Sequence, residues 1–305
     1  GLEISRVKYS KFINNEITDG TYALYLKNSP QYNEFIDNLA SGVEGVYVAS
    51  GEYNNFTGGR IEGSSCSYDL FTTDELSTVY FKNTNFTESR DICFYNTKTK
   101  FVYNDREDIE LWLITNVSSS LILTRKITLW SKAIMKWNES TSSLRTLKYN
   151  ISGLFPNKEY KIYNDTDLIY TLTTDSFGNL NFTISINGEH SITVKYGNCE
   201  EVITSLPYTI GKSNTYYCMD SNLYIPGQTA ISFSSGIQNS TLDCLGFTID
   251  SDDTTNTYGV YLTGDATINN TIRNCKITDF NKGCLLYTSD AADELDGVDL
   301  GGRRI

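Results

Sequence analysis

The chain has few of the residues that most often carry catalysis or bind metals. Its 305 residues include one histidine and two methionines. The single histidine, His190, has no nucleophile motif beside it, so a Ser-His-Asp or Cys-His mechanism is not supported, and we expect a structural role at a strand edge. Scarce histidine and methionine also argue against copper handling. The seven cysteines show no Cys-x-x-Cys spacing, so a zinc site is not supported.

Positive charge is also scarce. Lysine and arginine number 25 against 37 aspartates and glutamates, which gives a formal net charge of −12. An acidic chain without a basic face does not neutralise phosphates, so we expect no nucleic-acid partner. No apolar run is long enough for a transmembrane helix, so we predict no membrane span in this stretch of chain. Few prolines and many tyrosines and asparagines are typical of a secreted β-rich protein.

A short phrase recurs at a fixed period near the N-terminus. Gly1-Leu-Glu-Ile4 returns as Ala23-Leu-Tyr-Leu26 and as Gly45-Val-Tyr-Val48, which is a period of 22 residues. Far downstream the phrase returns as Gly259-Val-Tyr-Leu262, and Gly283 begins a further copy at a period of 24. Fixed periods of this length predict a solenoid of stacked β-coils.

A second phrase follows the first in each early coil. It begins at Tyr9, Tyr32 and Tyr53, and it ends on apolar residues that we expect to stack in the interior, Ile17, Leu39 and Ile61. Asn and Gly between these positions predict sharp corners, because Asn tolerates left-handed backbone angles and equivalent amides can bond along the stack. The charged run at 104–108 is interpreted as the end of this solenoid.

The downstream copies, 239–249, 259–262 and 267–277, carry a resemblance to a known family. They are similar to the right-handed parallel β-helix repeats of the pectate-lyase-like superfamily, particularly the surface and periplasmic repeat proteins of archaea and bacteria. The resemblance covers residues 1 to about 106 and about 215 to 283. It implies an all-β fold and leaves activity open, because many functions use this scaffold.

Between the two solenoid stretches, the pattern changes to short alternating strands separated by turn residues. We predict an antiparallel β-sandwich over 138–198, and the phrase at 153–160 resembles fibronectin-like modules. Residues 107–137 are predicted to be capping and connecting strands, and 199–214 a linker. The predicted order is therefore β-helix (1–106), connecting strands, sandwich, linker and a second β-helix (215–283).

The last stretch of the sequence, 284–305, breaks the repeat one residue after Gly283. It resembles no repeat and looks like one reading frame of a sequencing adapter followed by a primer sequence. We therefore interpret it as a non-native tail and leave it out of the fold prediction. The remaining chain is then expected to be a metagenomic fragment, an interior slice of a longer protein.

Six cysteines remain without the tail, an even number that permits disulfides in an extracellular, cell-surface or periplasmic chain. Cys199 and Cys218 are the most plausible pair, because both flank the linker. Cys244 and Cys275 occupy related repeat positions, and two interpretations stay open: a disulfide, or a stack of buried small apolar residues.

Four residues are candidates for ligand binding. Asp69 and Asp91 share the 22-residue register and are expected to stack on one face, as the carboxylates of a polysaccharide-active site would. Trp112 and Trp137 lie in or beside the connecting strands. They are interpreted either as packing residues or as a platform on which sugars stack.

A calcium site is considered for the loop between two downstream coils, where Asp250, Asp252 and Asp253 cluster. Carboxylate oxygens are the ligands that Ca²⁺ prefers, but the spacing lacks the regular alternation and the glycine of a calcium loop. A solvated polar loop is the alternative interpretation. No other cofactor is expected.

Two functional hypotheses follow. The first is a non-catalytic extracellular or cell-surface protein with a structural, adhesive or carbohydrate-binding role, whose partners are surface polysaccharides or other surface proteins. The second is a polysaccharide lyase or glycoside hydrolase whose site lies on coils outside this sequence or on the Asp69 and Asp91 face. A flat face of Asn, Thr and Tyr would favour the first, and an aligned carboxylate cluster in a groove would favour the second.

Overall fold

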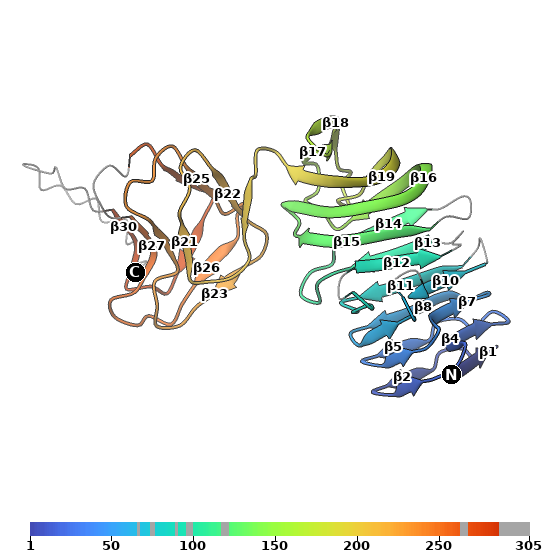
Figure 1. The fold of residues 1–305 in the computed structure, drawn as a ribbon. Helices are drawn as coiled ribbons and strands as arrows, with labels where there is room; N and C mark the ends of the chain where they lie inside the picture. The colour runs from blue at the N-terminus through green and yellow to red at the C-terminus, as the bar shows by residue number, and fades with distance from the viewer. Residues whose placement is uncertain are drawn as a thin grey trace, which may run out of the picture. The chain divides into compact units, whose positions relative to one another are not determined.

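The fold is all-β, as the repeats predict, and it divides into two compact units, Gly1–Gly197 and Asn198–Ile305 (Figure 1). The structure is a computed structural model that describes residues 1–65, 68–73, 77–88, 91–95, 100–116, 122–262 and 268–286, with the backbone alone at 91–95, 116 and 286. The described part of the chain holds no helix with the length and apolarity needed to cross a bilayer.

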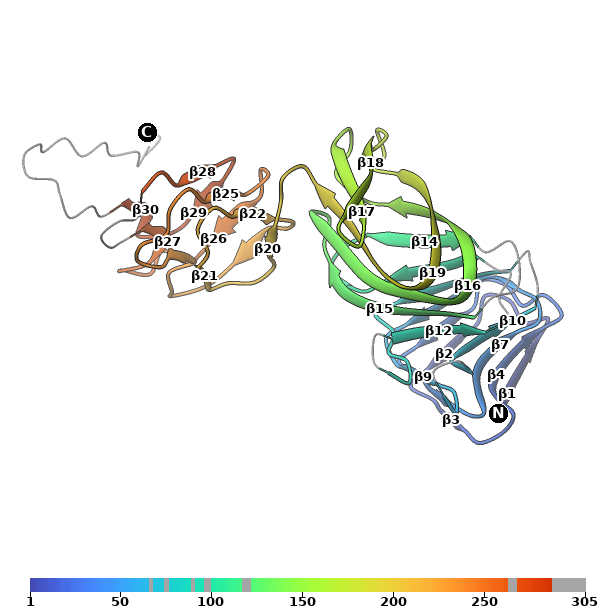
Figure 2. The ribbon, with the colours of Figure 1, turned by 45° about the horizontal axis from the view of Figure 1, so that its top comes forward.

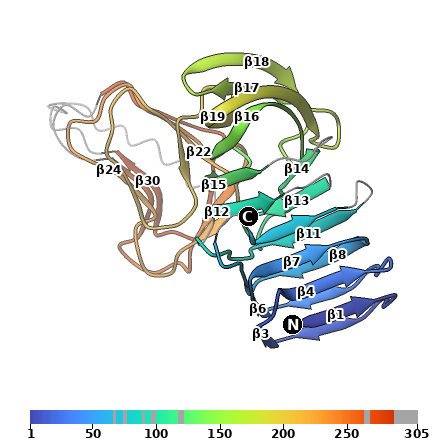
Figure 3. The ribbon, with the colours of Figure 1, turned by 45° about the vertical axis from the view of Figure 1, so that its right-hand side comes forward.

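The first unit begins as a parallel β-solenoid with three faces, and Figure 3 shows its coils stacked one on the next. Each strand pairs in parallel with the equivalent strand of the next coil. The first face contains β1 (Leu2–Ser5), β4 (Tyr22–Lys27), β7 (Glu44–Val48), β10 (Leu70–Thr72) and β12 (Asp91–Tyr95). The second contains β2 (Lys11–Ile13), β5 (Glu34–Ile36), β8 (Glu52–Thr57), β11 (Thr78–Lys82) and β13 (Lys100–Asn104), and the third β3 (Glu16–Thr18), β6 (Leu39–Ser41) and β9 (Arg60–Glu62).

The predicted period holds on the first face, where Leu2, Leu24 and Val46 lie side by side. On the third face the register differs from the prediction. Ile17 pairs with Ala40, and Ala40 pairs with Ile61, so Ala40 replaces Leu39 in the interior stack. The reason is that the coils are of unequal length. The step from Ile17 to Ala40 is one residue longer than the period and the step from Ala40 to Ile61 is one residue shorter, so only their average matches it.

The corner between the second and third faces behaves as the asparagines and glycines predict. Asn14, Asp37 and Gly58 adopt left-handed φ values of 53°, 51° and 63°. These are residue types that tolerate that conformation at little cost. The side-chain amide of Asn15 donates to that of Asn38 at 2.9 Å, so amides bond from coil to coil.

The parallel solenoid gives way to antiparallel strands after residue 104. β13 pairs with β14 (Trp112–Asn116), and β12 pairs with β15 (Leu123–Trp130), both antiparallel. β16 (Ile134–Ser152) then pairs with β15 through its first half and with β14 through its second half. One long strand therefore joins the two faces that the solenoid had kept apart.

The remaining strands of the unit are β17 (Glu159–Asn164), β18 (Asp167–Thr173) and β19 (Leu180–Tyr196). β19 pairs antiparallel with β16 along most of its length, and the two long strands curve together in Figure 2. β17 and β18 form a hairpin that pairs with β19 through β17. These antiparallel strands are hydrogen-bonded into the sheet of the solenoid, so no boundary at residue 138 divides the compact unit.

An ion pair lies fully buried inside the antiparallel part. Arg125 of β15 and Glu139 of β16 are 3.0 Å apart, and both side chains are 0% exposed. Thr115 accepts a hydrogen bond from Arg125, and Trp137 donates one to Glu139 at 2.6 Å. Buried charges need such partners, because an unpaired one costs several kcal/mol.

The second unit is another three-faced parallel solenoid, with a sheet on each face. Its first strand begins at Glu201, so the stretch 199–214, predicted to be a linker, instead contains two of its strands. The faces are β20 (Glu201–Ile203), β22 (Tyr216–Met219), β25 (Thr241–Asp243) and β28 (Thr271–Arg273); β21 (Tyr208–Ile210), β24 (Ile231–Phe233), β27 (Tyr258–Leu262) and β30 (Lys282–Leu286); and β23 (Leu223–Tyr224), β26 (Thr248–Asp250) and β29 (Lys276–Thr278).

The final strand extends past residue 284, where the sequence predicted that the repeat breaks. β30 pairs in parallel with β27, with Val260 beside Cys284 and Leu262 beside Leu286, at the same period that separates Gly259 from Gly283. The strand therefore continues past Gly283 to Leu286, because Cys284 and the two leucines after it are apolar residues that suit a strand. The rest of the stretch interpreted as adapter, 287–305, lies outside the described residues.

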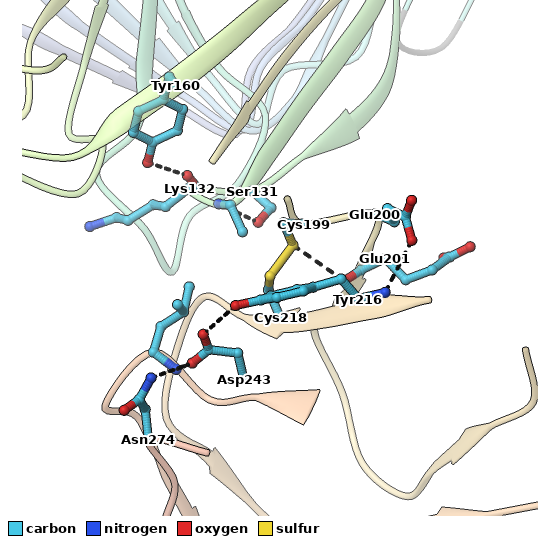
Figure 4. The surroundings of a disulfide bond; sticks show 12 residues. Ser131, Lys132, Tyr160, Cys199, Glu200, Glu201, Tyr216, Cys218, Asp243 and Asn274 are labelled. Atoms are coloured by element: carbon cyan, nitrogen blue, oxygen red, sulfur yellow. Dashed lines mark hydrogen bonds between the residues drawn. A yellow bond between two sulfur atoms is a disulfide. The ribbon is translucent and has the colours of Figure 1, made fainter. Parts of the chain in front are cut away.

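Two disulfides join neighbouring coils of the second unit. Cys199 is bonded to Cys218, and Figure 4 shows this bond beside the hydrogen bond from Tyr216 to Asp243. Cys244 is bonded to Cys275, with 4.7 Å between their Cα atoms, so the pair that the sequence left open is a disulfide. Of the other two cysteines before the predicted tail, Cys66 lies outside the described residues and Cys93 is described by its backbone alone.

Candidate functional site

Three tyrosines form a ladder on the first unit, where the chain enters the second-face strands. Tyr9 and Tyr32 have ring centroids 5.1 Å apart with 2° between their planes, and Tyr32 and Tyr53 are 5.1 Å apart with 5° between theirs. The side chains are 75%, 44% and 43% exposed. Offset parallel stacking is a favourable arrangement for aromatic rings. The solenoid thus displays a regular aromatic edge on its surface, which we call the tyrosine ladder.

The backbone of the ladder is strained. Tyr9, Tyr32 and Tyr53 have φ values of 54°, 56° and 55°, in the left-handed region that bulky side chains rarely adopt. Each such residue costs roughly 1 to 2 kcal/mol, whereas stacking returns only about 0.5 to 1.5 kcal/mol per pair. Strain of this kind concentrates at functional sites. The ladder is therefore a candidate binding feature as well as a packing feature.

Polar side chains line a groove beside the ladder, on the outward side of the second face. The strand register puts Glu34 next to Asn55, and Asn55 next to Tyr80. The same register puts Thr57 next to Lys82. Hydroxyl, amide, carboxylate and ammonium groups from β5, β8 and β11 therefore follow one another from coil to coil.

Trp112 and Glu110 lie beyond these coils and end the row. Lys82 Nζ is 2.6 Å from Glu110 Oε1, and Trp112 Nε1 donates to Glu110 Oε2 at 2.8 Å. The Lys82 ammonium also lies 5.8 Å from the centroid of the Trp112 ring, within range of a cation–π contact. Trp112 meets Tyr80 at an interplanar angle of 81°.

These residues enclose an open groove of about 620 Å³, which we call the tyrosine groove. It lies on the side of β5, β8 and β11, which Figure 1 labels. A volume of several hundred Å³ is typical of a ligand site. Its lining includes the aromatic residues Tyr9, Tyr32, Tyr53, Tyr80 and Trp112 and the charged residues Glu34, Lys82 and Glu110.

The charges of the groove are held in pairs. The hydrogen bond from Lys82 holds the pKa of the Glu110 carboxyl below its usual value, so this carboxyl is ionised at neutral pH. Glu34 is 2.6 Å from the ammonium of Lys11. Burial and the neighbouring Tyr53 raise the pKa of Tyr80, which keeps its hydroxyl protonated. The groove therefore offers neutral hydroxyl donors beside charges that are already neutralised.

Of the four predicted ligand-binding residues, the structure places one in the groove. Trp112 lines it, as the sugar-platform interpretation requires. Trp137 is 0% exposed and packs inside the antiparallel part, where Arg125 lies 5.9 Å from its ring. For Trp137 the packing interpretation therefore fits the structure, and the platform interpretation does not.

Asp69 and Asp91 do not form the predicted stack. Leu70 pairs with Phe94 rather than with Ile92, so the two aspartates are out of register between β10 and β12. The Asp69 side chain is buried and accepts hydrogen bonds from the Gly63 amide and the Thr87 hydroxyl. Burial raises its pKa to about 6, although these bonds oppose the rise. The side chain of Asp91 lies outside the described residues.

Two of the three aspartates considered for calcium accept hydrogen bonds from neighbouring hydroxyls. Asp250 accepts from the hydroxyl of Thr278 at 2.6 Å, and Asp252 accepts from the hydroxyl of Thr254 at 2.7 Å. Within the described ranges, no three His, Cys, Asp or Glu side chains gather closely enough to hold a metal ion. A calcium ion needs six or more oxygen ligands converging on one point, and calcium binding at this loop stays a prediction.

His190 lies on β19, with its Nδ1 2.9 Å from Asp165 Oδ2. The amide of Ser191 also donates to Asp165 at 2.8 Å. That amide bond, together with the contact to His190, lowers the pKa of the Asp165 carboxyl. These contacts tie β19 to the end of β17 and suit a structural role at a strand edge.

The groove was not predicted from the sequence, because the phrase that begins at Tyr9, Tyr32 and Tyr53 was interpreted only as part of the repeat. The available signal was the residue type. Tyr9, Tyr32 and Tyr53 recur at corner positions where Asn, Asp or Gly is the ordinary choice. An outward aromatic ladder could have been inferred from that mismatch. Lys82 and Glu110 gave no comparable signal, because they meet only when β13 and β14 pair.

Comparisons with protein-family models, curated proteins and solved structures find no significant match to this chain. Function is therefore inferred from the chemistry of the tyrosine groove.

Proposed function

We propose that the chain belongs to a non-catalytic extracellular or cell-surface protein and binds an extended glycan in the tyrosine groove. The observation that carries this proposal is the ladder itself. Tyr9, Tyr32 and Tyr53 hold an unfavourable backbone conformation at equivalent positions, and their exposed rings border a groove of about 620 Å³. The proposal explains why this strain is retained.

The repetition of the groove suits a polymer. Each of the four coils contributes one tyrosine, and the three coils after the first add one or two polar side chains each. Equivalent groups therefore recur at about the spacing of neighbouring strands, roughly 4.7 to 4.9 Å. Solenoids present extended concave surfaces of this kind to extended ligands. Phenol, amide and hydroxyl groups also match the many hydroxyls of a glycan chain.

The state of the carboxylates favours binding over hydrolysis. A glycosidase needs a carboxylic acid whose pKa is raised, so that it can protonate the leaving oxygen. Glu110 has a lowered pKa and Glu34 is paired with Lys11. Both carboxylates are thus arranged as hydrogen-bond acceptors.

An oxidising compartment is supported by the second unit. Disulfides such as Cys199–Cys218 and Cys244–Cys275 form and persist in extracellular and periplasmic environments. A surface location would also bring the groove into contact with polysaccharides.

The proposal is tested by affinity electrophoresis of the native protein through gels that contain a panel of polysaccharides. The wild type is expected to be retarded by at least one of them, and Tyr32→Asn is expected to lose most of that retardation. Tyr224→Asn is the matched control, because Tyr224 is 60% exposed and lies outside the groove lining. Equal retardation of all three proteins would contradict the groove as the site. Release of reducing ends or unsaturated uronates would contradict a non-catalytic role.

A further inference from the structure

The aromatic residues of the groove divide into two kinds by orientation. Tyr9, Tyr32 and Tyr53 are parallel within 5°, so each ring lies over part of its neighbour. Tyr80 keeps nearly the same orientation, at 21° to Tyr53. Stacked rings cover part of one another's faces, and they present their edges and hydroxyls to the groove. The ladder is thus better suited to hydrogen bonding than to stacking against a sugar.

Trp112 has the other orientation. Its plane is turned by 81° from that of Tyr80, so it interrupts the series of parallel rings. Its indole N–H is already used by Glu110, which fixes how the ring is turned. An aromatic face held in this way at the end of a polar groove suits contact with the C–H groups of a pyranose ring, because apolar contact and fixed polar partners together orient a ligand.

Charge in the groove bears on the class of ligand. Lys82 is committed to Glu110 and Lys11 to Glu34, both at 2.6 Å. An acidic glycan would gain a lysine only by breaking one of these pairs, and the released carboxylate would then repel it. A neutral glycan leaves both pairs intact, and the paired groups still accept and donate hydrogen bonds to its hydroxyls.

Resting on the proposed glycan-binding function, we propose that the ligand is an uncharged, extended polysaccharide, and that one of its sugar rings stacks on Trp112 while the tyrosine ladder hydrogen-bonds the units that follow. Trp112 is then the main anchor. The hydroxyls of Tyr32 and Tyr53 set the direction of the chain along the coils.

Intrinsic fluorescence tests this inference directly. The chain has three tryptophans, and Trp130 and Trp137 are 4% and 0% exposed. A ligand that stacks on Trp112 should therefore change the emission of this residue alone. The protein is titrated with neutral cello-oligosaccharides and mannan, with acidic polygalacturonate and alginate, and with cationic chitosan oligomers. Calorimetry gives the affinities in parallel.

We expect a neutral glycan to bind and to change the emission of the wild type. Trp112→Phe should abolish the emission change and weaken binding by about tenfold or more. Tyr32→Phe, which keeps the ring and removes one hydroxyl, should weaken binding only about two- to fivefold. Circular dichroism and melting curves check that both variants fold.

The alternative outcomes separate the two proposals. If polygalacturonate or alginate binds more tightly than any neutral glycan and Tyr32→Asn still abolishes binding, the ligand class is wrong and the glycan-binding function stands. If a neutral glycan binds equally well to Trp112→Phe, the stacking position is wrong. If no saccharide binds the wild type, both proposals are overturned.

Discussion

The two solenoids place different residues at the same kind of corner. In the first unit, Tyr9 and Tyr32 stand two residues before their second-face strands, at φ values of 54° and 56°. In the second unit, Asn214, Asn239 and Asn269 stand two residues before Tyr216, Thr241 and Thr271, at 55°, 56° and 56°. Asn239 donates to Asn214 at 3.1 Å, and Asn269 donates to Asn239 at 2.8 Å.

The difference between asparagine and tyrosine at these corners distinguishes residues that the fold requires from residues that it does not require. A left-handed corner is required in both solenoids, and asparagine satisfies it at low cost while its amide bonds to the next coil. Tyrosine satisfies it at a higher cost. The need for a left-handed corner therefore does not explain the tyrosines, and we propose that glycan binding at the groove does.

The largest loss of stability is expected from the buried ion pair between Arg125 and Glu139 in the first unit. It is compared with the loss of a disulfide between coils of the second unit. Arg125→Met leaves Glu139 buried without its cation, and should lower the free energy of unfolding by about 3 to 5 kcal/mol. All three tryptophans lie in the first unit, so denaturation followed by fluorescence reports on it.

The double variant Arg125→Met with Glu139→Leu is the control. It removes both charges and should recover much of the loss, because an apolar pair of similar volume needs no partner. A loss below about 1 kcal/mol in the single variant would contradict the buried arrangement.

The second unit should depend on its covalent links. Replacing Cys244 and Cys275 with serine opens a bridge between residues 31 apart in sequence, and should destabilise this unit by about 2 to 4 kcal/mol. Hydrogen exchange of the second unit measures the effect, and tryptophan fluorescence follows the first unit as the control. Equal destabilisation of both units would contradict their separate cores.

A third prediction concerns Asp69 and pH. Burial raises its pKa from 3.8 to about 6, so the folded state binds this proton more tightly than the unfolded state does. The stability from protonated Asp69 is fully present below about pH 4 and is lost as the pH rises through about 6. One pKa unit corresponds to about 1.4 kcal/mol, so the loss is about 2 to 3 kcal/mol.

Asp69→Asn keeps a similar shape without the titration. Its unfolding free energy, followed by tryptophan fluorescence between about pH 4 and pH 7, should lack this part of the pH dependence. An unchanged slope in the variant would contradict the assignment to Asp69.

The smallest loss of stability is expected when a corner asparagine of the second unit is replaced by tyrosine. Asn239→Tyr introduces the strained residue into the second unit and breaks its amide bonds to Asn214 and Asn269. We expect a loss of about 1 kcal/mol, measured by hydrogen exchange of this unit. Asn239→Gly, which keeps the corner and removes only the amide, is the control and should lose less. A stabilised tyrosine variant would contradict the strain argument.

Much of the fold could be predicted from the sequence because solenoid periodicity is local and repetitive. The spacing of Leu24 and Val46, the corner at Asn14 and the strand through Val260 all follow from a constant period. Leu39 was misplaced because a longer coil followed by a shorter one averages to the same period, and only pairing reveals which residue faces inward.

Most of the groove could not be predicted. Trp112 was a candidate, but its partners Lys82 and Glu110 come together through the antiparallel pairing of β13 with β14, which no period encodes. The position of Asp69 was also predicted wrongly, because the prediction assumed a constant 22-residue register. A change in register between β10 and β12 separates it from Asp91, and such a change leaves no mark on the composition.

The most direct test replaces Tyr9, Tyr32 and Tyr53 together with asparagine, the residue that the second unit uses at its own corners. The melting temperature of the first unit and the retention on a polysaccharide that binds the wild type are measured on the same samples. The account predicts an unchanged or higher melting temperature together with loss of retention. A variant that unfolds at lower temperature and still retains the glycan would show that the tyrosines serve the fold, and would contradict it.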